Sequence, residues 1–386
     1  MTDQDYMRRA IELAVKGSGW TNPNPLVGAV IVKEGRIIGE GYHRKYGELH
    51  AERNAIASLT ESAVGATMYV TLEPCCHYGK TPPCTEAILE NGIGRVVIGS
   101  ADPNPKVAGK GARLLKKAGV LVEEDFLREE CDRINQIFFH YITCHTPYVI
   151  MKYAMTADGK TATKTGASKW ITGDAARMEV QKLRHRCMGI MAGIGTVLAD
   201  DPMLNVRIPE GNSPIRIICD SRLRIPADSQ ICRTAKEYPT IVAYAQGEGC
   251  VAEDSLAGTG IHKEVMGKGS EEKMRQLEQL GVRLLPVSGG SGRIDLKKLM
   301  NLLGEQGIDS ILLEGGGILN DSALRSGIVQ EVQAFVAPKI FGGNGAKSPV
   351  EGFGVELPQD AFPLEFRKAA QIGEDLLIEY KVRQVE

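Results

Sequence analysis

One histidine and two cysteines near the start of the chain constrain the fold more than any other feature of the sequence. His50 opens a segment with helical periodicity. Cys75 follows a strand predicted for residues 68–72, and Cys84 precedes a helix predicted for residues 85–90. Imidazole and thiolate together suit zinc, and a catalytic zinc keeps only three protein ligands so that water can take the fourth position. The fold must therefore bring two strand-to-helix junctions together.

Glu52 lies two residues after His50, close enough to exchange protons with a water molecule at such a site. Bound zinc lowers the pKa of that water, so that hydroxide forms near neutral pH and can attack an amidine carbon. A carboxylate that binds no metal can then take the proton and return it to the departing amine. The sequence thus predicts hydrolytic deamination with one Zn²⁺ per chain and Glu52 as the proton shuttle.

The spacing of the two cysteines departs from the pattern of zinc base deaminases, which is H-x-E followed by P-C-x-x-C. Eight residues, 76–83, separate the cysteines of this chain. Cys76 or His77 could in principle bind the metal instead, but Cys75 and Cys84 each follow a proline, as in that pattern. The alternative readings are a structural zinc, or a histidine and buried cysteines without metal. A structural zinc would require a fourth protein ligand and would leave the neighbouring glutamate unexplained.

The length of 386 residues favours two hydrophobic cores. Strands and helices alternate up to a predicted helix over 125–142, and Pro147 then discourages continuation of that helix. We therefore predict domains at 1–146 and 147–386, the first a three-layer α/β domain. Further strands are expected at 26–32, 37–40, 95–99, 148–153, 189–192, 215–219, 240–243, 283–285 and 310–313, further helices at 110–117, 174–186 and 295–303, and an inserted loop at 246–269.

Composition excludes several classes of protein. The formal net charge of −2 provides no basic field for a nucleic acid. The first ten residues lack the pattern of a secretory signal, and the apolar run 187–199 is too short for a membrane span. Nine cysteines in such a chain indicate thiols and metal ligands and not a disulfide framework. We expect a cytoplasmic enzyme that binds neither nucleic acid nor membrane.

Several motifs together resemble those of the bifunctional deaminase/reductase family of riboflavin biosynthesis, and the inserted loop between the cysteines is part of the resemblance. The matching segments cover both predicted domains and are residues 22–28, 41–43, 50–52, 71–84, 101–105, 151–159, 193–202 and 313–317. The resemblance implies a cytidine-deaminase-like domain followed by a dihydrofolate-reductase-like domain. It also implies a small pyrimidine ribose-phosphate substrate, NADPH as the second cofactor, and a homo-oligomer.

For the deaminase, the resemblance places five residues at the substrate: Asn24, His43, Lys80, Asp102 and Asn104. Asparagine can read a pyrimidine edge both as donor and as acceptor. Lys80 and a protonated His43 would meet the ribose phosphate. Without the resemblance, Lys80 would be read as a solvated loop lysine.

For the reductase, three glycines at 315–317 follow a buried-looking strand and precede a helix, which suits a phosphate. The resemblance places NADPH against Ala154, Trp170, Thr196, Asp200, Ser221, Gly316, Gly317, Ile318, Leu319, Asn320, Asp321 and Ser322. It places the reductase substrate against Ser168, Arg184, Leu204, Arg207 and Glu314. Arg184 and Arg207 would hold the phosphate, and Ser221 would select the cofactor's 2′-phosphate. Lys152 either orients the substrate carbonyl or caps the end of its strand.

Two other functions compete with this interpretation. A tRNA or free-base deaminase would share the histidine and glutamate, but it predicts the short cysteine spacing and a basic groove. A zinc nucleobase deaminase with a non-catalytic, ligand-binding C-terminal domain differs in its products. Identifying the products formed with and without NADPH would distinguish these functions.

Overall fold

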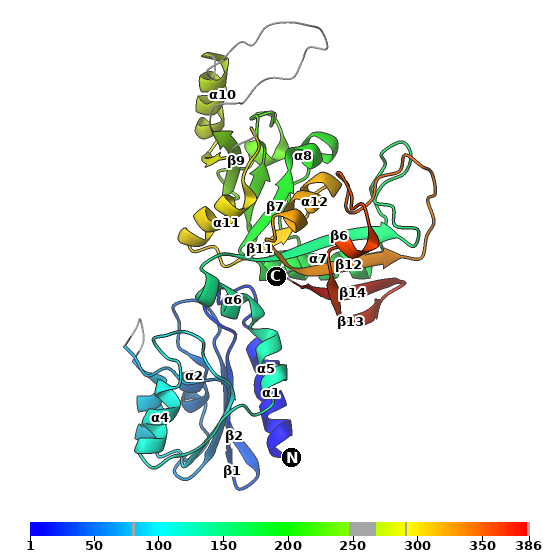
Figure 1. Ribbon diagram of the computed structural model, residues 1–386. Coiled ribbons are helices and arrows are strands. Elements are labelled where there is room, and N and C mark those ends of the chain that lie inside the picture. Colours follow the sequence, from blue (N-terminus) through cyan, green and yellow to red (C-terminus); the bar gives the residue numbers. More distant parts are fainter. Residues whose placement is uncertain (79–81, 247–267, 290–291, 384–386) are drawn as a thin grey trace, which may run out of the picture. The chain divides into compact units, whose positions relative to one another are not determined.

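The computed structural model describes residues 1–78, 82–246, 268–289 and 292–383 (Figure 1). The chain divides into two compact units, Met1–His145 and Thr146–Glu386, and each is described here by itself. None of the helices in the described ranges combines the length and the apolar character that a membrane span requires.

The first unit is built on a five-stranded sheet with the strand order β2-β1-β3-β4-β5. β1 pairs antiparallel with β2 and with β3, whereas β3, β4 and β5 run parallel. The strands are β1 (Gly28–Lys33), β2 (Arg36–Tyr42), β3 (Thr67–Leu72), β4 (Arg95–Ser100) and β5 (Leu121–Glu123).

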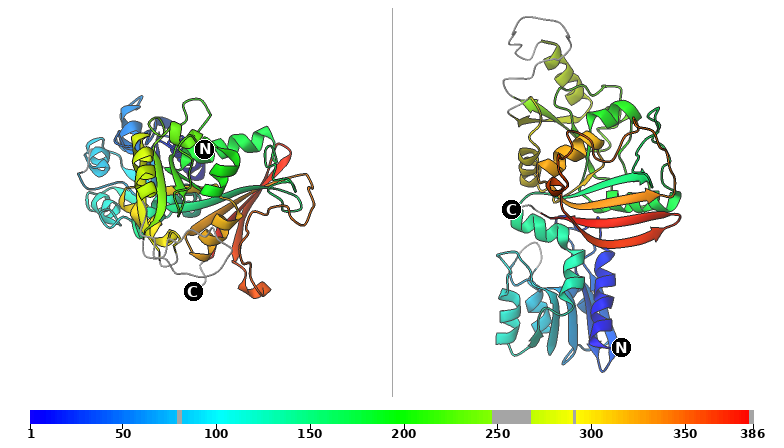
Figure 2. Two further views of the ribbon diagram at one scale, coloured as in Figure 1. Left: turned by 90° about the horizontal axis from the view of Figure 1, so that it is seen from above. Right: turned by 45° about the vertical axis from the view of Figure 1, so that its right-hand side comes forward.

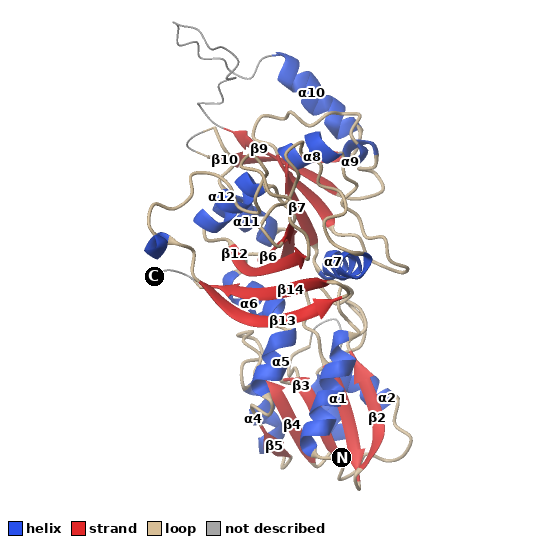
Figure 3. Cartoon of the chain, turned by 90° about the vertical axis from the view of Figure 1, so that its right-hand side faces the viewer, coloured by secondary structure: helices blue, strands red, loops and turns tan. Residues whose placement is uncertain are grey.

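Helices cover both faces of this sheet, which makes three layers (Figure 3). Side chains alternate between the faces of a strand, so Val30 and Val32 of β1 pack towards α1, while Ala29 and Ile31 pack towards α2. The helices are α1 (Asp3–Val15) and α5 (Arg128–Ile134) on one face, α2 (Ala51–Ala57), α3 (Cys84–Glu90) and α4 (Lys110–Lys117) on the other, and α6 (Gln136–Cys144) at the end of the unit.

A glycine on β2 lets α2 lie directly on the sheet. A Cβ atom at Gly41 would lie 2.2 Å from the backbone nitrogen of Ala55 and 2.6 Å from the carbonyl oxygen of Ala51. Any larger residue would push the helix away. Since His50 is the N-cap of α2, this close contact sets the depth at which His50 and Glu52 lie.

The second unit contains a nine-stranded sheet with the order β10-β9-β8-β7-β11-β6-β12-β14-β13. The strands from β10 to β12 run parallel, and β14 and β13 complete the sheet antiparallel (Figure 2). The strands are β6 (Tyr148–Thr156), β7 (Gly189–Gly193), β8 (Ile215–Cys219), β9 (Thr240–Gln246), β10 (Val282–Ser288), β11 (Ser310–Leu313), β12 (Val329–Ala337), β13 (Leu364–Ile372) and β14 (Asp375–Val382).

Hydrophobic clusters lie on both faces of the parallel part of this sheet. Met191 of β7 belongs to the cluster formed with α11 and α12, whereas the preceding residue, Ile190, belongs to the cluster formed with α8, α9 and α10. The helices are α7 (Asp174–Arg186), α8 (Ile194–Asp200), α9 (Gln230–Arg233), α10 (Lys268–Gln279), α11 (Leu296–Glu305) and α12 (Gly317–Arg325), with a 3₁₀ turn at Pro358–Asp360.

The structure differs from the sequence-based expectation in several places, among them the helices α8, α9 and α10, which were not expected. The helix expected over 125–142 is two helices, because Asn135 breaks it: the side chain of Asn135 donates to the carbonyl of Leu26 (2.9 Å) and accepts from its N–H (2.8 Å). Strands β12, β13 and β14 were not expected. The loop expected at 246–269 lies largely outside the described residues.

Candidate active sites

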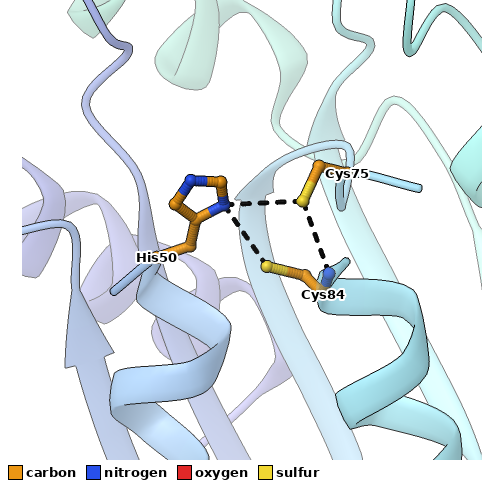
Figure 4. A group of neighbouring side chains, drawn as sticks. All are labelled: His50, Cys75 and Cys84. Atoms are coloured by element: carbon orange, nitrogen blue, oxygen red, sulfur yellow. Dashed lines mark hydrogen bonds between the residues drawn. The ribbon is translucent and has the colours of Figure 1, made fainter. Parts of the chain in front are cut away.

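The structure brings His50, Cys75 and Cys84 together at the N-termini of α2 and α3 (Figure 4). The Nδ1 atom of His50 lies 3.5 Å from Sγ of Cys75 and 3.4 Å from Sγ of Cys84. Tetrahedral zinc with Zn–S of about 2.3 Å and Zn–N of about 2.1 Å separates such ligand atoms by about 3.6 Å. The three side chains therefore fit one zinc ion. Among the described residues, neither Cys76 nor His77 joins this cluster.

The electrostatics of the cluster favour the thiolate that zinc binds. Hydrogen bonds from the Cys84 thiol and the His50 ring lower the pKa of the Cys75 thiol well below its usual range, while the pKa of the Cys84 thiol is raised. The backbone N–H of Cys84 also donates to Sγ of Cys75, at 3.4 Å. Helix N-termini stabilise thiolates in the same way. Cys75 is therefore prepared as an anionic ligand.

Glu52 lies in the first turn of α2 and is only 3% exposed. Burial raises the pKa of its carboxyl, and the negative charge of Cys75 raises it further. A carboxyl with a raised pKa can accept a proton and release it again near neutral pH. The position and the protonation behaviour of Glu52 therefore suit a proton shuttle.

His43 lies beside His50, with the ring centroids 5.4 Å apart. The Nδ1 atom of His43 is 3.1 Å from the carbonyl oxygen of Leu49, so Nδ1 carries the proton and donates it. The Nε2 atom then accepts from Nδ2 of Asn24, at 3.3 Å. Burial lowers the pKa of His43. His43 is therefore neutral, which corrects the expected protonated form, and it orients the amide of Asn24.

Asp102 and Asn104 lie in the loop after β4, while Lys80 lies outside the described residues. The carboxylate of Asp102 accepts from the N–H of Asn104 at 2.8 Å, and burial raises the pKa of Asp102 to about 6.

Glu73, which sequence reasoning missed, holds this loop: its carboxylate accepts from the N–H of Gly109 at 2.8 Å and of Ala112 at 3.2 Å. The position of Glu73, two residues before Cys75, was the sequence signal that could have identified it.

In the second unit, Glu314 directly follows β11 and contacts two cations. Its carboxylate pairs with the guanidinium of Arg184 through two hydrogen bonds of 2.7 and 3.1 Å, and it lies 3.5 Å from Nζ of Lys152. The side chains of all three residues are at most 14% exposed. Burial alone would raise the pKa of Glu314, but the two cations outweigh it and lower the pKa to about 2. Lys152 lies inside β6, so the interpretation that it caps a strand end is wrong.

Two of the other residues expected at the reductase substrate, Leu204 and Arg207, lie in a loop that contacts Arg184. Arg184 also donates to the carbonyl of Asn205 at 3.0 Å, which ties it to the loop that carries Leu204 and Arg207. Gln181 of α7 accepts from the N–H of Arg207 at 2.8 Å. The structure thus brings Arg184, Leu204 and Arg207 to one region, with Arg184 already paired to Glu314. Ser168 donates to the carboxylate of Asp200 at 3.4 Å.

Of the residues expected at NADPH, Thr196 and residues 316–322 follow the ends of β7 and β11, which are neighbours in the sheet. The N-cap of α12 is Gly316, and no side chain caps this helix. A Cβ atom at Gly316 would lie 3.9 Å from Oγ1 of Thr196, so the two loops meet. The buried Oδ1 atom of Asn320 has no partner. An uncapped helix N-terminus with glycines beside it fits the phosphates of a dinucleotide.

The remaining expected NADPH residues have partners within the chain or face outward. The hydroxyl of Ser221 accepts from the N–H of Ile294 at 3.4 Å. Trp170 is 65% exposed and lies against the guanidinium of Arg177. Asp321 pairs with Arg325, and Ser322 donates to the carbonyl of Ile318. Leu319 packs against Gly193, and Ala154 lies on β6.

Sequence reasoning also missed Arg216, which is fully buried in β8. Its five N–H groups make six hydrogen-bond contacts with five neutral oxygens, including Oγ1 of Thr240 and the carbonyls of Met203 and Ile231. Burial lowers its pKa to about 10. A charged residue within an otherwise apolar predicted strand was the signal that could have identified it.

Comparison with known proteins matches both units. Residues 147–378 match the family model of the RibD C-terminal domain, and residues 1–100 match the cytidine and deoxycytidylate deaminase zinc-binding region. The riboflavin biosynthesis protein RibD of Actinobacillus pleuropneumoniae is 54% identical over 382 residues, which cover 99% of this chain and 96% of that protein.

Solved structures are similar over the same length. Acinetobacter baumannii RibD is 36% identical with a TM-score of 0.83, and 99% of each chain is covered. A diaminohydroxyphosphoribosylaminopyrimidine deaminase/5-amino-6-(5-phosphoribosylamino)uracil reductase from Thermotoga maritima is 36% identical with a TM-score of 0.82, and 98% of each chain is covered. These structures confirm the predicted fold class, a deaminase domain followed by a dihydrofolate-reductase-like domain.

Proposed function

Because this chain belongs to the RibD family of riboflavin biosynthesis proteins, we propose that it performs both reactions named for its Thermotoga maritima relative. The chain is a zinc-dependent deaminase and an NADPH-dependent reductase. The deaminase would hydrolyse the 2-amino group of 2,5-diamino-6-(5-phosphoribosylamino)pyrimidin-4-one. The reductase would convert the ribosyl group of the product to ribityl, which gives 5-amino-6-(5-phosphoribitylamino)uracil.

The observation that carries the deaminase assignment is the meeting of His50, Cys75 and Cys84 beside the buried Glu52. Zinc held by these ligands supplies the acidification of a water molecule. Glu52 takes a proton from the attacking water and delivers it to the amine, so that ammonia leaves and oxygen takes its place.

The pyrimidine would lie against the amide of Asn24, which the neutral His43 orients. Because Nδ2 of Asn24 donates to His43, the Oδ1 atom of Asn24 would accept a hydrogen bond from a ring N–H of the pyrimidine. Asp102 and Asn104 would complete this pocket, and Lys80 would meet the ribose phosphate. Glu73 supports the pocket from behind through its bonds to the 102–109 loop.

In the reductase, NADPH supplies the hydride. The ammonium of Lys152 would donate a hydrogen bond to the ribose carbonyl, and Glu314, 3.5 Å from Nζ, orients this ammonium. Arg184 and Arg207 would hold the substrate phosphate. Arg184 would use the N–H groups that are not bonded to Glu314. Ser168 and Leu204 would line the pocket.

NADPH would place its phosphates at the N-terminus of α12, over Gly316 and Gly317. The described surroundings of this helix end include Thr196 of α8, Asn320 of α12 and Glu351, whose side chain lies against Gly317. The remaining contacts would come from Ala154, Trp170, Asp200, Ser221, Ile318, Leu319, Asp321 and Ser322. Equal turnover with NADH and NADPH would contradict a role of Ser221 in reading the 2′-phosphate.

Product analysis by mass spectrometry tests the proposal. The purified chain receives the diaminopyrimidine ribose-phosphate with and without NADPH. We expect deamination alone without NADPH and the ribityl product with it. Deamination in both arms would indicate a C-terminal domain that binds ligands without catalysis, and no reaction in either arm would refute the assigned substrate.

We also propose a homo-oligomer that works in the cytoplasm. β13 ends the described sheet and exposes Phe366 to 62%, and such edges favour pairing with a second copy. The cysteines in the described part of the chain are all free thiols, which suits a reducing compartment. Light scattering and cell fractionation test the two statements.

A further inference from the structure

A single arginine connects the two helices of the zinc cluster. Arg53 directly follows Glu52 on α2, and its guanidinium reaches the chain just before Cys84. Its Nε atom donates to the carbonyl of Pro82 at 3.1 Å, and one terminal nitrogen donates to the carbonyl of Pro83 at 2.9 Å. Neither the proposed chemistry nor the expected substrate contacts include Arg53.

The two prolines make this contact structurally important. Proline has no backbone N–H, so the segment before Cys84 can be held by its backbone only through carbonyl oxygens. Pro83 is the N-cap of α3, and no side chain caps that helix. Guanidinium presents its donors in a rigid fork, which suits two neighbouring acceptors. Arg53 binds both carbonyls at once.

At the start of α3, two backbone N–H groups bond to the other cysteine ligand, while Ile88 further along α3 shares a hydrophobic cluster with Ala51 and Ala55 of α2. The N–H of Cys84 donates to Sγ of Cys75 at 3.4 Å, and the N–H of Thr85 donates to the carbonyl of Cys75 at 3.2 Å. These bonds hold Cys84 relative to Cys75, but they leave open its distance from His50 on α2. Apart from contacts of the cluster's own side chains, such as the 3.4 Å approach of Nδ1 of His50 to Sγ of Cys84, Arg53 joins α2 to the backbone at the start of α3.

We propose that Arg53 is a positioning residue that holds Cys84 at its distance from His50 and Glu52. Helix α2 then carries a zinc ligand, the proton shuttle and the anchor of the second cysteine ligand. The inference rests on the proposed ligands His50, Cys75 and Cys84. It adds a residue that binds neither metal nor substrate.

Zinc release measures this role directly. Arg53→Ala removes both bonds, and Arg53→Lys keeps the charge but not the fork. We expect Arg53→Ala to release zinc about tenfold faster to an excess of a colorimetric chelator and to lose about tenfold in deaminase kcat/KM. Arg53→Lys should release zinc at a rate between those of the wild type and Arg53→Ala, since an ammonium reaches one carbonyl at a time. The reductase of the same chain should stay within about twofold.

Arg36→Ala is the matched control, because Arg36 is an exposed arginine of the same unit that pairs with Glu61. It should release zinc at the wild-type rate. Wild-type zinc release from Arg53→Ala would overturn the inference, even if deamination falls. If Arg53→Ala does not fold, wild-type zinc release from Arg53→Lys overturns it equally. A wild-type chain that binds no zinc would instead refute the proposed ligands.

Discussion

The group formed by Glu314, Arg184 and Lys152 predicts a large and pH-dependent loss of stability when its carboxylate is removed. Glu314→Gln keeps the shape of the side chain but leaves two buried cations without their partner. A pKa that falls from 4.5 to about 2 on folding corresponds to about 3 kcal/mol. Breaking a buried ion pair by removing one partner costs about 3–5 kcal/mol, which agrees.

The sign of the pH dependence follows from the lowered pKa. The stabilisation by Glu314 is complete above the pKa of the unfolded chain and is lost as the pH falls from about 4.5 towards 2. We therefore expect the free energy of unfolding of Glu314→Gln to lie about 3 kcal/mol below wild type at pH 7. At pH 3.5 the difference should shrink to about 2 kcal/mol.

Urea unfolding followed by tryptophan fluorescence measures the effect. The chain has two tryptophans, one in each unit, so a Trp20→Phe background leaves Trp170 to report on the second unit. Glu179→Gln is the control, because Glu179 forms an exposed pair with Lys182 that contributes about 1 kcal/mol or less. A loss below about 1 kcal/mol for Glu314→Gln, or an equal loss at both pH values, would refute the reasoning.

Three further outcomes are expected. Glu52→Gln should lower the deaminase kcat by about 10²–10⁴ and leave the reductase unchanged when deaminated substrate is supplied, and intact deamination would contradict the shuttle role. Gly41→Ala should weaken zinc retention in a chelator assay, because its Cβ would lie 2.2 Å from the nitrogen of Ala55, and unchanged retention would show that α2 can shift freely. Arg216→Met should destabilise the second unit by about 3 kcal/mol in the fluorescence assay, because it leaves buried oxygens such as Oγ1 of Thr240 without a donor, whereas a neutral result would show that water replaces it.

Local patterns were sufficient for the elements that carry clear periodicity. The strand at β11 and the helices α7 and α11 occur where apolar spacing predicted them. Strand β13 was not predicted, because its residues are mostly exposed and show no apolar alternation. The helix break at Asn135 was not predicted, because its cause is a pair of hydrogen bonds to Leu26, more than a hundred residues away in sequence.

The sites, too, could be predicted from the sequence only in part. The identity and spacing of His50, Glu52, Cys75 and Cys84 indicated zinc deaminase chemistry from the sequence, because ligand type and count limit the metal and its reaction. The sequence also indicated the family, through motifs in both units. The roles of single substrate and cofactor residues remain predictions.

Tertiary structure alone decided how these groups act on one another. Glu314 and Arg184 are 130 residues apart in sequence, and only the pairing of β11 with its neighbours makes them a buried ion pair with Lys152. The neutral state of His43 likewise depends on its burial and on the carbonyl of Leu49. Residue types specify which chemistry is available, whereas charge state and pairing depend on distances and burial that exist only in the folded chain.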